Sequence, residues 1–271
     1  MGLRRIGRPL AAAIFASLLG ASVALCETEG DLSPQSAQVD LQAPFKTRSP
    51  WRFVATQGPA TTDYGDNPAP GALKLCLEKD GAGRCDSEIM PRQPDDPNLL
   101  WGPHYLRIVK PVYPRGRAAA PLLLVVTASL HSGDGGQAVV TQLFSYDPAL
   151  DQFKRVYSYS TGTNNNQEVR FVTSGPLRGY VISAEPTQNA PYAYWIEVGD
   201  FTRDHAYRPI IKYRSATLYN DGNTLAVIDS EMPNIERRLG VWRPGAPLPL
   251  PVGGTKACPK PHLKGMALWC G

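Results

Sequence analysis

Apolar residues along this chain alternate with polar ones or form short blocks, and turn-forming residues interrupt them at short intervals. The densest region is 121–184, with strand-like segments at residues 122–128, 137–146, 153–160, 167–173 and 179–184. Such alternation is typical of β-strands, whereas helices need apolar residues three and four positions apart. Because we find no convincing amphipathic helix, the pattern predicts an all-β fold.

Four segments resemble one another, since each is an apolar strand that ends in a polar residue and precedes a loop and a further extended segment. They are residues 53–57, 125–129, 181–185 and 227–231. A degenerate repeat of four-stranded units is typical of propeller blades, so we predict a small β-propeller-like fold. An irregular β-sandwich is the alternative, because half-buried hairpins resemble one another in any fold.

In a propeller, the polar residues at the ends of these four segments would meet near a central channel. They are Gln57, Ser129, Glu185 and Glu231. Carboxylates that converge repel one another unless a cation, an arginine or a proton lies between them. The repeat therefore predicts a polar site at the channel.

The N-terminal residues indicate export. Arg4, Arg5 and Arg8 precede an uncharged apolar stretch that ends in small residues, which is typical of a secretory signal peptide. We predict a signal peptide over residues 1–26, cleaved near Ala24–Cys26, and a periplasmic or secreted protein. An uncleaved membrane anchor and lipidation of Cys26 are the alternatives.

The rest of the chain divides into two parts. Residues 27–50 are polar and lack a sustained period, so we predict a flexible N-terminal arm. Residues 51–271 are expected to form a single β-rich domain. Loss of the three leader arginines leaves 25 Lys and Arg against 24 Asp and Glu. This near-neutral domain predicts no nucleic-acid partner, no membrane contact after cleavage, and a monomer.

An even set of cysteines remains after the leader, which in an exported protein indicates disulfides. Asp80–Gly81 is a strong hairpin turn signal. Counting outward from it places Cys76 opposite Cys85 on a rung where Cα atoms lie about 4.5 Å apart. We predict the disulfides Cys76–Cys85 and Cys258–Cys270.

The second disulfide would clasp residues 258–270 against the body of the domain, with Trp269 as the anchor. Zinc held by Cys258, His262 and Cys270 is the alternative. The spacing of these three residues matches no familiar ligand set. An oxidising compartment also favours the disulfide.

The sequence contains none of the motifs G-x-S-x-G, H-E-x-x-H, G-x-x-x-x-G-K or C-x-x-C, which mark common catalytic and cofactor sites. The four histidines are scattered, and each lacks an obvious partner. We therefore predict no catalytic residue and no metal site, and we favour a protein that is not an enzyme.

Two polar segments stand out, residues 161–170 and residues 219–231. Their amides and carboxylates suit sugar hydroxyls or a cation such as calcium, although the spacing is not that of an EF-hand. Ordinary turns also contain such residues. The candidate ligand-binding residues, including Glu185 and Glu231 from the channel, are Asn164, Asn165, Asn166, Glu168, Arg170, Glu185, Asp229 and Glu231.

These observations favour a ligand-binding or protein-interaction domain whose partner is an envelope glycan or a protein. Tyrosines crowd the second half of the chain, and their flat faces suit either partner. A glycan hydrolase is the alternative. It would need two carboxyl groups about 5 to 10 Å apart, drawn from Glu168, Glu185, Asp229 and Glu231.

Overall fold

The computed structural model describes residues 36–81, 83–91, 102–115, 120–163 and 166–271. Antiparallel strands are the dominant element among these residues and form three four-stranded and two two-stranded sheets. The all-β prediction is therefore confirmed. The expected signal peptide lies outside the described residues. Within them, no helix has the length and apolar character that crossing a membrane requires.

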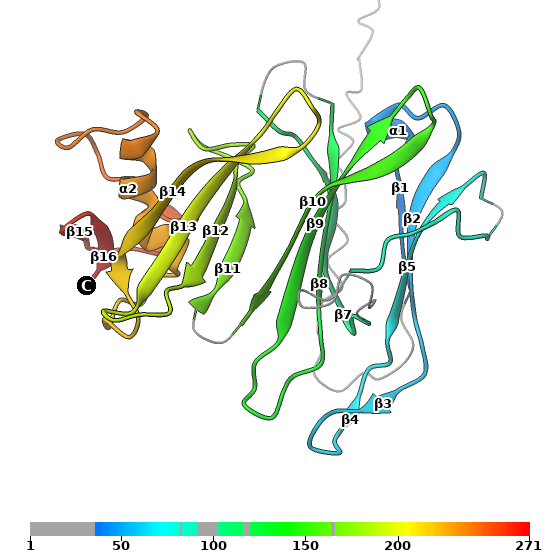
Figure 1. The fold of residues 1–271 in the computed structure, drawn as a ribbon, viewed down its shortest axis with the longest axis horizontal. Helices are drawn as coiled ribbons and strands as arrows, with labels where there is room; N and C mark the ends of the chain where they lie inside the picture. The colour runs from blue at the N-terminus through cyan, green and yellow to red at the C-terminus, as the bar shows by residue number, and fades with distance from the viewer. Residues whose placement is uncertain (1–35, 82, 92–101, 116–119, 164–165) are drawn as a thin grey trace, which may run out of the picture.

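The first sheet contains the N-terminal strands in the order β1-β2-β5-β6 (Figure 1). Its strands are β1 (Ser36–Asp40), β2 (Trp51–Gln57), β5 (Leu73–Lys79) and β6 (Ser87–Glu88). Two small elements lie in its connections: helix α1 (Gln42–Phe45), and the pair of strands β3 (Thr61–Thr62) and β4 (Pro68–Ala69).

The second and third sheets are meanders in which each strand pairs with the next along the chain. The second sheet contains β7 (Tyr105–Val112), β8 (Leu122–Ala128), β9 (Ala138–Asp147) and β10 (Gln152–Gly162). The third contains β11 (Glu168–Phe171), β12 (Val181–Pro186), β13 (Ala193–Phe201) and β14 (Tyr207–Leu218). The C-terminal elements are helix α2 (Val227–Arg238), the 3-10 turn η2 (Gly254–Lys256), and the hairpin of β15 (Pro261–Lys264) and β16 (Ala267–Cys270).

The three sheets stack in chain order, so the second sheet is covered on both faces (Figure 1). On β8, Leu123 packs with Phe53 of the first sheet. The adjacent Leu124 packs with Val181 of the third sheet. Neighbouring residues of a strand point to opposite faces, so a strand that is covered on both sides needs apolar residues at every position. This explains the uninterrupted apolar run that opens β8.

Helix α2 covers the remaining face of the third sheet. Ile182 and Ile196 of that sheet share an apolar cluster with Ile228 and Ile235 of the helix. The molecule therefore consists of three sheets followed by one helical layer, with the β15–β16 hairpin beside α2 (Figure 1).

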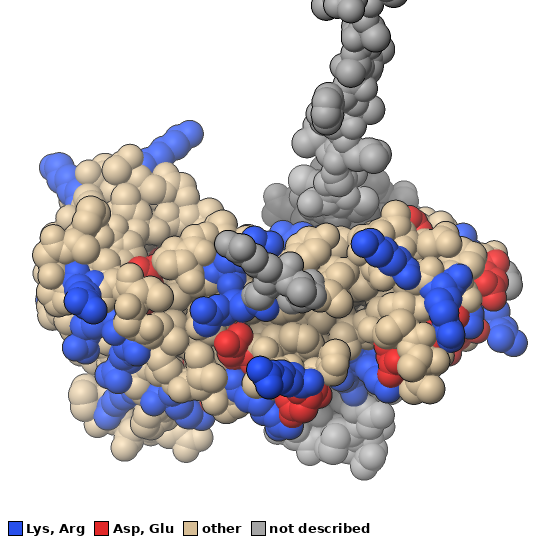
Figure 2. All heavy atoms as spheres, turned by 90° about the horizontal axis from the view of Figure 1, so that it is seen from above, with Lys and Arg blue, Asp and Glu red and all other residues tan. Residues whose placement is uncertain are grey.

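Charged side chains are dispersed over the face that Figure 2 shows. Lys and Arg lie across much of this face and are separated by uncharged residues, and Asp and Glu lie among them on part of it. This face therefore carries mixed charge.

The expected repeat coincides with the sheets for three of its four members. Residues 53–57, 125–129 and 181–185 lie on β2, β8 and β12, each of which is the second strand of its sheet. None of the described sheets closes on itself. The described part of the chain therefore contains three open four-stranded sheets.

The prediction that residues 227–231 form the fourth member is wrong, because these residues form the first part of α2. The expectation that the chain has no amphipathic helix is also wrong. The buried residues include Val227, Ile228, Ser230, Glu231, Asn234 and Ile235, which recur with a helical period. Three of them, Ser230, Glu231 and Asn234, are polar. Polar residues on the buried face and Pro233 inside the helix hide the period from a hydrophobicity pattern.

Residues 36–50 belong to the first sheet, in contrast to the flexible arm expected for residues 27–50. β1 pairs with β2 along all five of its residues. Leu41 and Phe45 are buried in the core between the first two sheets. Elements of four and five residues are too short to show a period in the sequence, which explains the difference.

Cys76 and Cys85 form the predicted disulfide, with Cα atoms 5.5 Å apart. Asp80 and Gly81 have φ angles of 60° and 64°, as the predicted two-residue turn requires. The predicted register is wrong, because Cys76 pairs with Glu88 instead of Cys85. After the turn, Asp86 Oδ2 accepts the backbone N–H of Lys79 at the end of β5 (2.7 Å). The returning chain joins the ladder only at β6.

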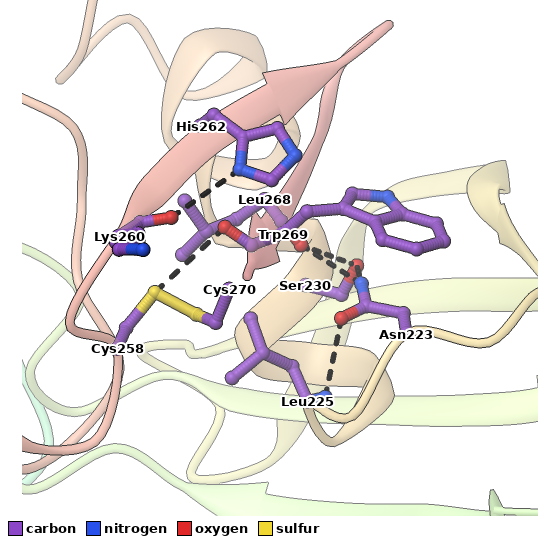
Figure 3. Close-up of a disulfide and its surroundings, with 9 residues drawn as sticks. All are labelled: Asn223, Leu225, Ser230, Cys258, Lys260, His262, Leu268, Trp269 and Cys270. Carbon is purple, nitrogen blue, oxygen red and sulfur yellow. Dashed lines mark hydrogen bonds between the residues drawn. A yellow bond between two sulfur atoms is a disulfide. The ribbon is translucent and has the colours of Figure 1, made fainter.

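Cys258 and Cys270 form the second predicted disulfide, with Cα atoms 5.1 Å apart. The residue that anchors this hairpin is Leu268, which is fully buried. Its carbonyl accepts hydrogen bonds from Asn223 Nδ2 (2.8 Å) and Ser230 Oγ (3.2 Å) (Figure 3). The expected anchor, Trp269, is only partly buried, because neighbouring side chains of β16 point to opposite faces.

Replacing both Cys258 and Cys270 with serine will lower the free energy of unfolding by about 3 kcal/mol, because the cross-link restricts the unfolded chain. Urea unfolding with a fluorescence readout measures this loss. The matched control replaces Cys76 and Cys85, whose sequence separation of 9 is close to the separation of 12 at the C-terminal pair. Comparable losses are expected, and a C-terminal loss below about 1 kcal/mol would contradict the clasp.

Candidate functional site

Three of the predicted ligand-binding residues meet where β11 lies beside the start of α2. Arg170 Nη1 donates to Asp229 Oδ1 (2.6 Å), and Arg170 Nη2 donates to Asp229 Oδ2 (3.2 Å). The same Nη2 lies 3.0 Å from Glu168 Oε2. The guanidinium therefore occupies the space between the two carboxylates.

Glu168 also caps α2 from a distant part of the chain. Its Oε1 accepts the N–H of Ile228 (2.7 Å), whereas Ala226 at the N-cap provides no side-chain hydrogen bond. A carboxylate stabilises a helix N-terminus through the free amides and the helix dipole. Burial lowers the pKa of Arg170, but Asp229 and Glu168 outweigh this effect and raise it. This ion-pair cluster fastens α2 to the third sheet.

Glu231 is fully buried on the inner face of α2. It accepts two hydrogen bonds from Thr217, through N and Oγ1 at 2.8 Å each, one from Tyr213 OH (3.0 Å) and one from Asn234 Nδ2 (3.0 Å). A carboxylate has about four acceptor positions, so these donors satisfy it. Burial and the charge of Glu231 raise the pKa of Tyr213, which keeps this phenol protonated as a donor.

Glu185 lies apart from this cluster, on the face of the third sheet toward β10. Burial raises the pKa of Tyr157 on β10, and the charges of Glu197 and Glu185 add to the rise. Asn164 and Asn165 lie outside the described residues. The predicted site residues are thus divided between two faces of the third sheet.

The predicted convergence of Gln57, Ser129, Glu185 and Glu231 at a central channel is wrong. Gln57, the last residue of β2, donates through Nε2 to the backbone carbonyls of Gly71 (3.1 Å) and His104 (3.0 Å). Glu231 lies in the helical layer behind the third sheet. The prediction failed because it treated residues 227–231 as a strand.

A pocket of about 380 Å³ lies beside the start of α2. Its walls come from the loop before β11, from β13, from the end of β14 and from the loop that leads to α2. The lining residues are Asn166, Tyr194, Thr217, Leu218, Asn220, Asp221, Gly222, Asn223, Leu225 and Val227. The two polar segments that stand out in the sequence, 161–170 and 219–231, therefore meet in space.

Tyr194 is the most informative residue of the pocket. Its side chain is 1% exposed, and within the described part of the chain its hydroxyl makes no hydrogen bond. Burial raises the pKa of Tyr194. The Asn166 side chain opposes this rise, and the charges of Tyr219 and Asp221 add to it. The Asn166 side chain therefore donates toward the phenol oxygen, although the contact falls outside the distance and angle limits of a hydrogen bond, and the proton of the hydroxyl has no acceptor among the described residues. The phenol stays protonated and offers an unused donor.

The loop between β14 and α2 is held in a fixed shape. Asp221 Oδ2 accepts the N–H of Leu218 (3.1 Å), and its Oδ1 accepts the N–H of Asn223 (2.9 Å). Asn220 and Gly222 have φ angles of 55° and 85°, which suit asparagine and glycine. Asn223 joins the loop to the C-terminal hairpin (Figure 3), so the clasp supports the pocket.

Exposed rings lie at the ends of β13 and β14 next to the pocket. Tyr192 is 56% exposed and Tyr219 is 39% exposed. The N–H of Tyr219 donates to the carbonyl of Tyr192 (2.9 Å). Arg214 Nη2 donates to the carbonyls of Asn189 (3.1 Å) and Pro191. These contacts fix the backbone that carries both tyrosines.

The sequence did not single out Tyr194 or Thr217 as site residues, and it indicated Asn223 only as a member of the polar segment 219–231. Tyr194 belongs to a tyrosine-rich region in which half of the rings are expected to be core. Its hydroxyl becomes a signal only when the surrounding donors and acceptors are known. Thr217 and Asn223 act through contacts with α2, which the sequence pattern did not reveal.

A second pocket, of about 450 Å³, lies near the ends of β8 and β9. Its polar groups are largely satisfied: Ser129 Oγ donates to the carbonyl of Leu130 (2.6 Å), and Gln137 Nε2 donates to the carbonyl of Ser129 (2.8 Å). Within the described residues, no group of three or more His, Cys, Asp or Glu side chains is placed to hold a metal ion. The pocket beside α2 is therefore the better candidate.

No protein-family model, no curated protein and no solved structure matches this chain. The chemistry of the pocket must therefore be inferred from its own residues. These supply hydroxyls, side-chain amides and one carboxylate, which are groups that bind polar ligands through hydrogen bonds.

Proposed function

We propose that this protein is a periplasmic or secreted β-rich binding domain that holds a small polar molecule in the pocket beside α2. The unused hydroxyl of Tyr194 carries the proposal. A buried donor without a partner costs about 1 to 3 kcal/mol. A ligand acceptor at this position removes that cost when it binds.

Export is supported by the two disulfides, since such bonds persist in oxidising compartments. The signal-like N-terminal sequence agrees with this assignment. The disulfide Cys258–Cys270 also supports the wall of the proposed binding site through Leu268 and Asn223. An oxidising location would therefore suit binding as well as folding.

We also propose that the three sheets are successive units of a degenerate, propeller-like repeat. The support is that three sequence-related segments occupy the second strand of each sheet, and that the sheets pack face to face as blades do. In this view α2 covers the face that a fourth unit would cover.

The alternative function, a glycan hydrolase, has less support. Such an enzyme needs two carboxyl groups free to exchange protons or attack the sugar. Glu168 and Asp229 both bind Arg170, and four hydrogen bonds satisfy Glu231. Glu185 lies on the opposite face of the third sheet, away from these three.

Replacing Tyr194 with phenylalanine tests the proposal. The free energy of unfolding of this variant will be about 1 kcal/mol higher than that of the wild type, because an unsatisfied buried hydroxyl is removed. The same change will weaken binding at the pocket about tenfold, since the donor to the ligand is lost. Chemical denaturation measures the first effect. Titration of a fragment set of small neutral, cationic and anionic polar compounds, followed by the amide NMR signals of residues 217–225, measures the second.

Tyr213→Phe is the matched control, because the Tyr213 hydroxyl donates to Glu231. We expect this variant to lose about 1 to 3 kcal/mol of stability, opposite in sign to Tyr194→Phe. The proposal fails if no fragment shifts the signals of residues 217–225, or if Tyr194→Phe leaves every affinity unchanged.

A further inference from the structure

The charge of the pocket restricts what it accepts. Among the described residues that line it, Asp221 alone carries a formal charge. Both of its oxygens accept backbone hydrogen bonds, from Leu218 and Asn223. A carboxylate engaged in this way holds a turn and is poorly placed to be the counter-ion of a bound cation. The remaining polar lining consists of amides and hydroxyls, which bind neutral groups well.

An anion is disfavoured for a different reason. The N-terminus of α2 adjoins the pocket, and free helix amides attract anions. Here Glu168 accepts the N–H of Ile228, and Asp229 lies in the first turn. Arg170 is occupied by both carboxylates. The positive end of the helix is therefore already compensated, and Asp221 would repel a further negative charge.

The rim of the pocket adds a second kind of contact. Tyr192 and Tyr219 are exposed at the paired ends of β13 and β14, and Tyr219 lies between two lining residues, Asn220 and Leu218, of which Leu218 is 41% exposed. A sugar ring presents an apolar C–H face and a polar hydroxyl edge. Aromatic side chains bind the first, and amides and hydroxyls such as Asn166, Asn220 and Tyr194 bind the second.

We infer that the pocket beside α2 binds the terminal residue of a neutral glycan, and that the next sugar lies on the exposed rings of Tyr219 and Tyr192. This inference rests on the proposed binding function and specifies its ligand class. Tyr194 donates to a hydroxyl or ring oxygen of the terminal sugar. The side-chain amides of Asn166 and Asn220, both exposed at the pocket, supply donors and acceptors to neighbouring hydroxyls.

The test is a titration of the full chain with a panel of probes. The panel contains neutral monosaccharides, neutral gluco-, galacto- and N-acetylglucosamine oligosaccharides of two to four units, and charged probes: glucuronic acid, glucosamine, lysine and inorganic phosphate. Isothermal calorimetry gives affinities, and the NMR signals of residues 217–225 locate binding. We expect a neutral oligosaccharide to bind about tenfold more tightly than its monosaccharide, because only the longer chain reaches the rim.

Tyr219→Ala separates the rim from the pocket. We expect it to weaken oligosaccharide binding about tenfold and to leave monosaccharide binding within about twofold. Tyr194→Phe weakens both. Tyr113→Ala is the control, because Tyr113 is another exposed tyrosine (45%) but directly follows β7 of the second sheet, whereas Tyr219 lies between two lining residues of the pocket, Leu218 and Asn220. It should change neither affinity.

The outcomes distinguish the inference from the proposed function. If glucosamine, lysine, glucuronic acid or phosphate binds at residues 217–225 in a Tyr194-dependent way and neutral sugars do not, the glycan inference is overturned and the binding function stands. If Tyr219→Ala affects mono- and oligosaccharides equally, the rim assignment is overturned. If no probe shifts these signals, or if Tyr194→Phe leaves the affinity for sugars unchanged, both the inference and the proposed function are overturned.

Discussion

Replacing Glu231 with alanine will lower the free energy of unfolding by about 4 kcal/mol, the largest effect that we expect from a single substitution. The change removes a fully buried carboxylate and deprives four donors of this acceptor: Thr217 N, Thr217 Oγ1, Tyr213 OH and Asn234 Nδ2. It also opens a cavity between α2 and β14. Urea unfolding measures the loss.

Glu231→Gln is the matched control. The amide keeps one oxygen for the two Thr217 donors, and its NH₂ group can donate to Tyr213 if the phenol turns to accept. We expect this variant to lose only about 1 kcal/mol. Equal losses for the alanine and glutamine variants would mean that the negative charge itself, not hydrogen-bond satisfaction, stabilises this part of the core.

The second large effect is expected at Asp151, which joins the first two sheets. Its Oδ2 lies 2.8 Å from Lys79 Nζ and accepts Ser49 Oγ (2.7 Å), while its Oδ1 accepts Trp51 Nε1 (3.1 Å) and Tyr146 OH. The hydrogen bonds from Lys79, then Tyr146, hold the pKa of Asp151 far below its ordinary value, although burial opposes them. We expect Asp151→Asn to cost about 3 kcal/mol at neutral pH.

The depressed pKa also sets the sign of a pH dependence. A carboxyl group whose pKa is lower in the folded state binds fewer protons there than in the unfolded chain, so its contribution is complete above the unfolded pKa of about 3.9. It is lost progressively as the pH falls below that value. The stability difference between wild type and Asp151→Asn should therefore be constant from about pH 5 to 8 and should narrow below about pH 4.

Stability curves at several pH values provide the measurement, and Asp147→Asn is the comparison. Asp147 belongs to the same β9–β10 connection, but its partner Lys154 is half-exposed, so little stability is expected from it. A difference for Asp151→Asn that stays unchanged between pH 5 and pH 2 would contradict the assignment.

Much of the sheet architecture was predictable because its signals are local. The two-sided burial of β8 is visible as an unbroken apolar run, and the Asp80–Gly81 turn is visible as a dipeptide. Both cysteine pairs followed from their count and spacing. The register beyond the turn was not predictable, since a side chain of the returning strand, Asp86, takes the place of a ladder hydrogen bond.

Helix α2 and the pocket were not predictable as a unit, because the interactions that form them are distant in the chain. The helix lacks a side-chain cap of its own and buries Ser230 and Glu231, whose partners outside the helix lie on β14, in the adjacent loop and on β16. The sequence indicated both polar segments separately. Only the strand order of the third sheet brings Glu168 and Arg170 to Asp229.

The attachment of α2 to β11 has a consequence for how this part of the molecule assembles. A peptide limited to residues 227–238 would lack the carboxylate of Glu168 and would contain Pro233, so it would stay unstructured in water. The third sheet must then exist before the helix does, and loss of that sheet must melt the helix. The third sheet and α2 form one cooperative unit, and the pocket beside α2 exists only while both are intact.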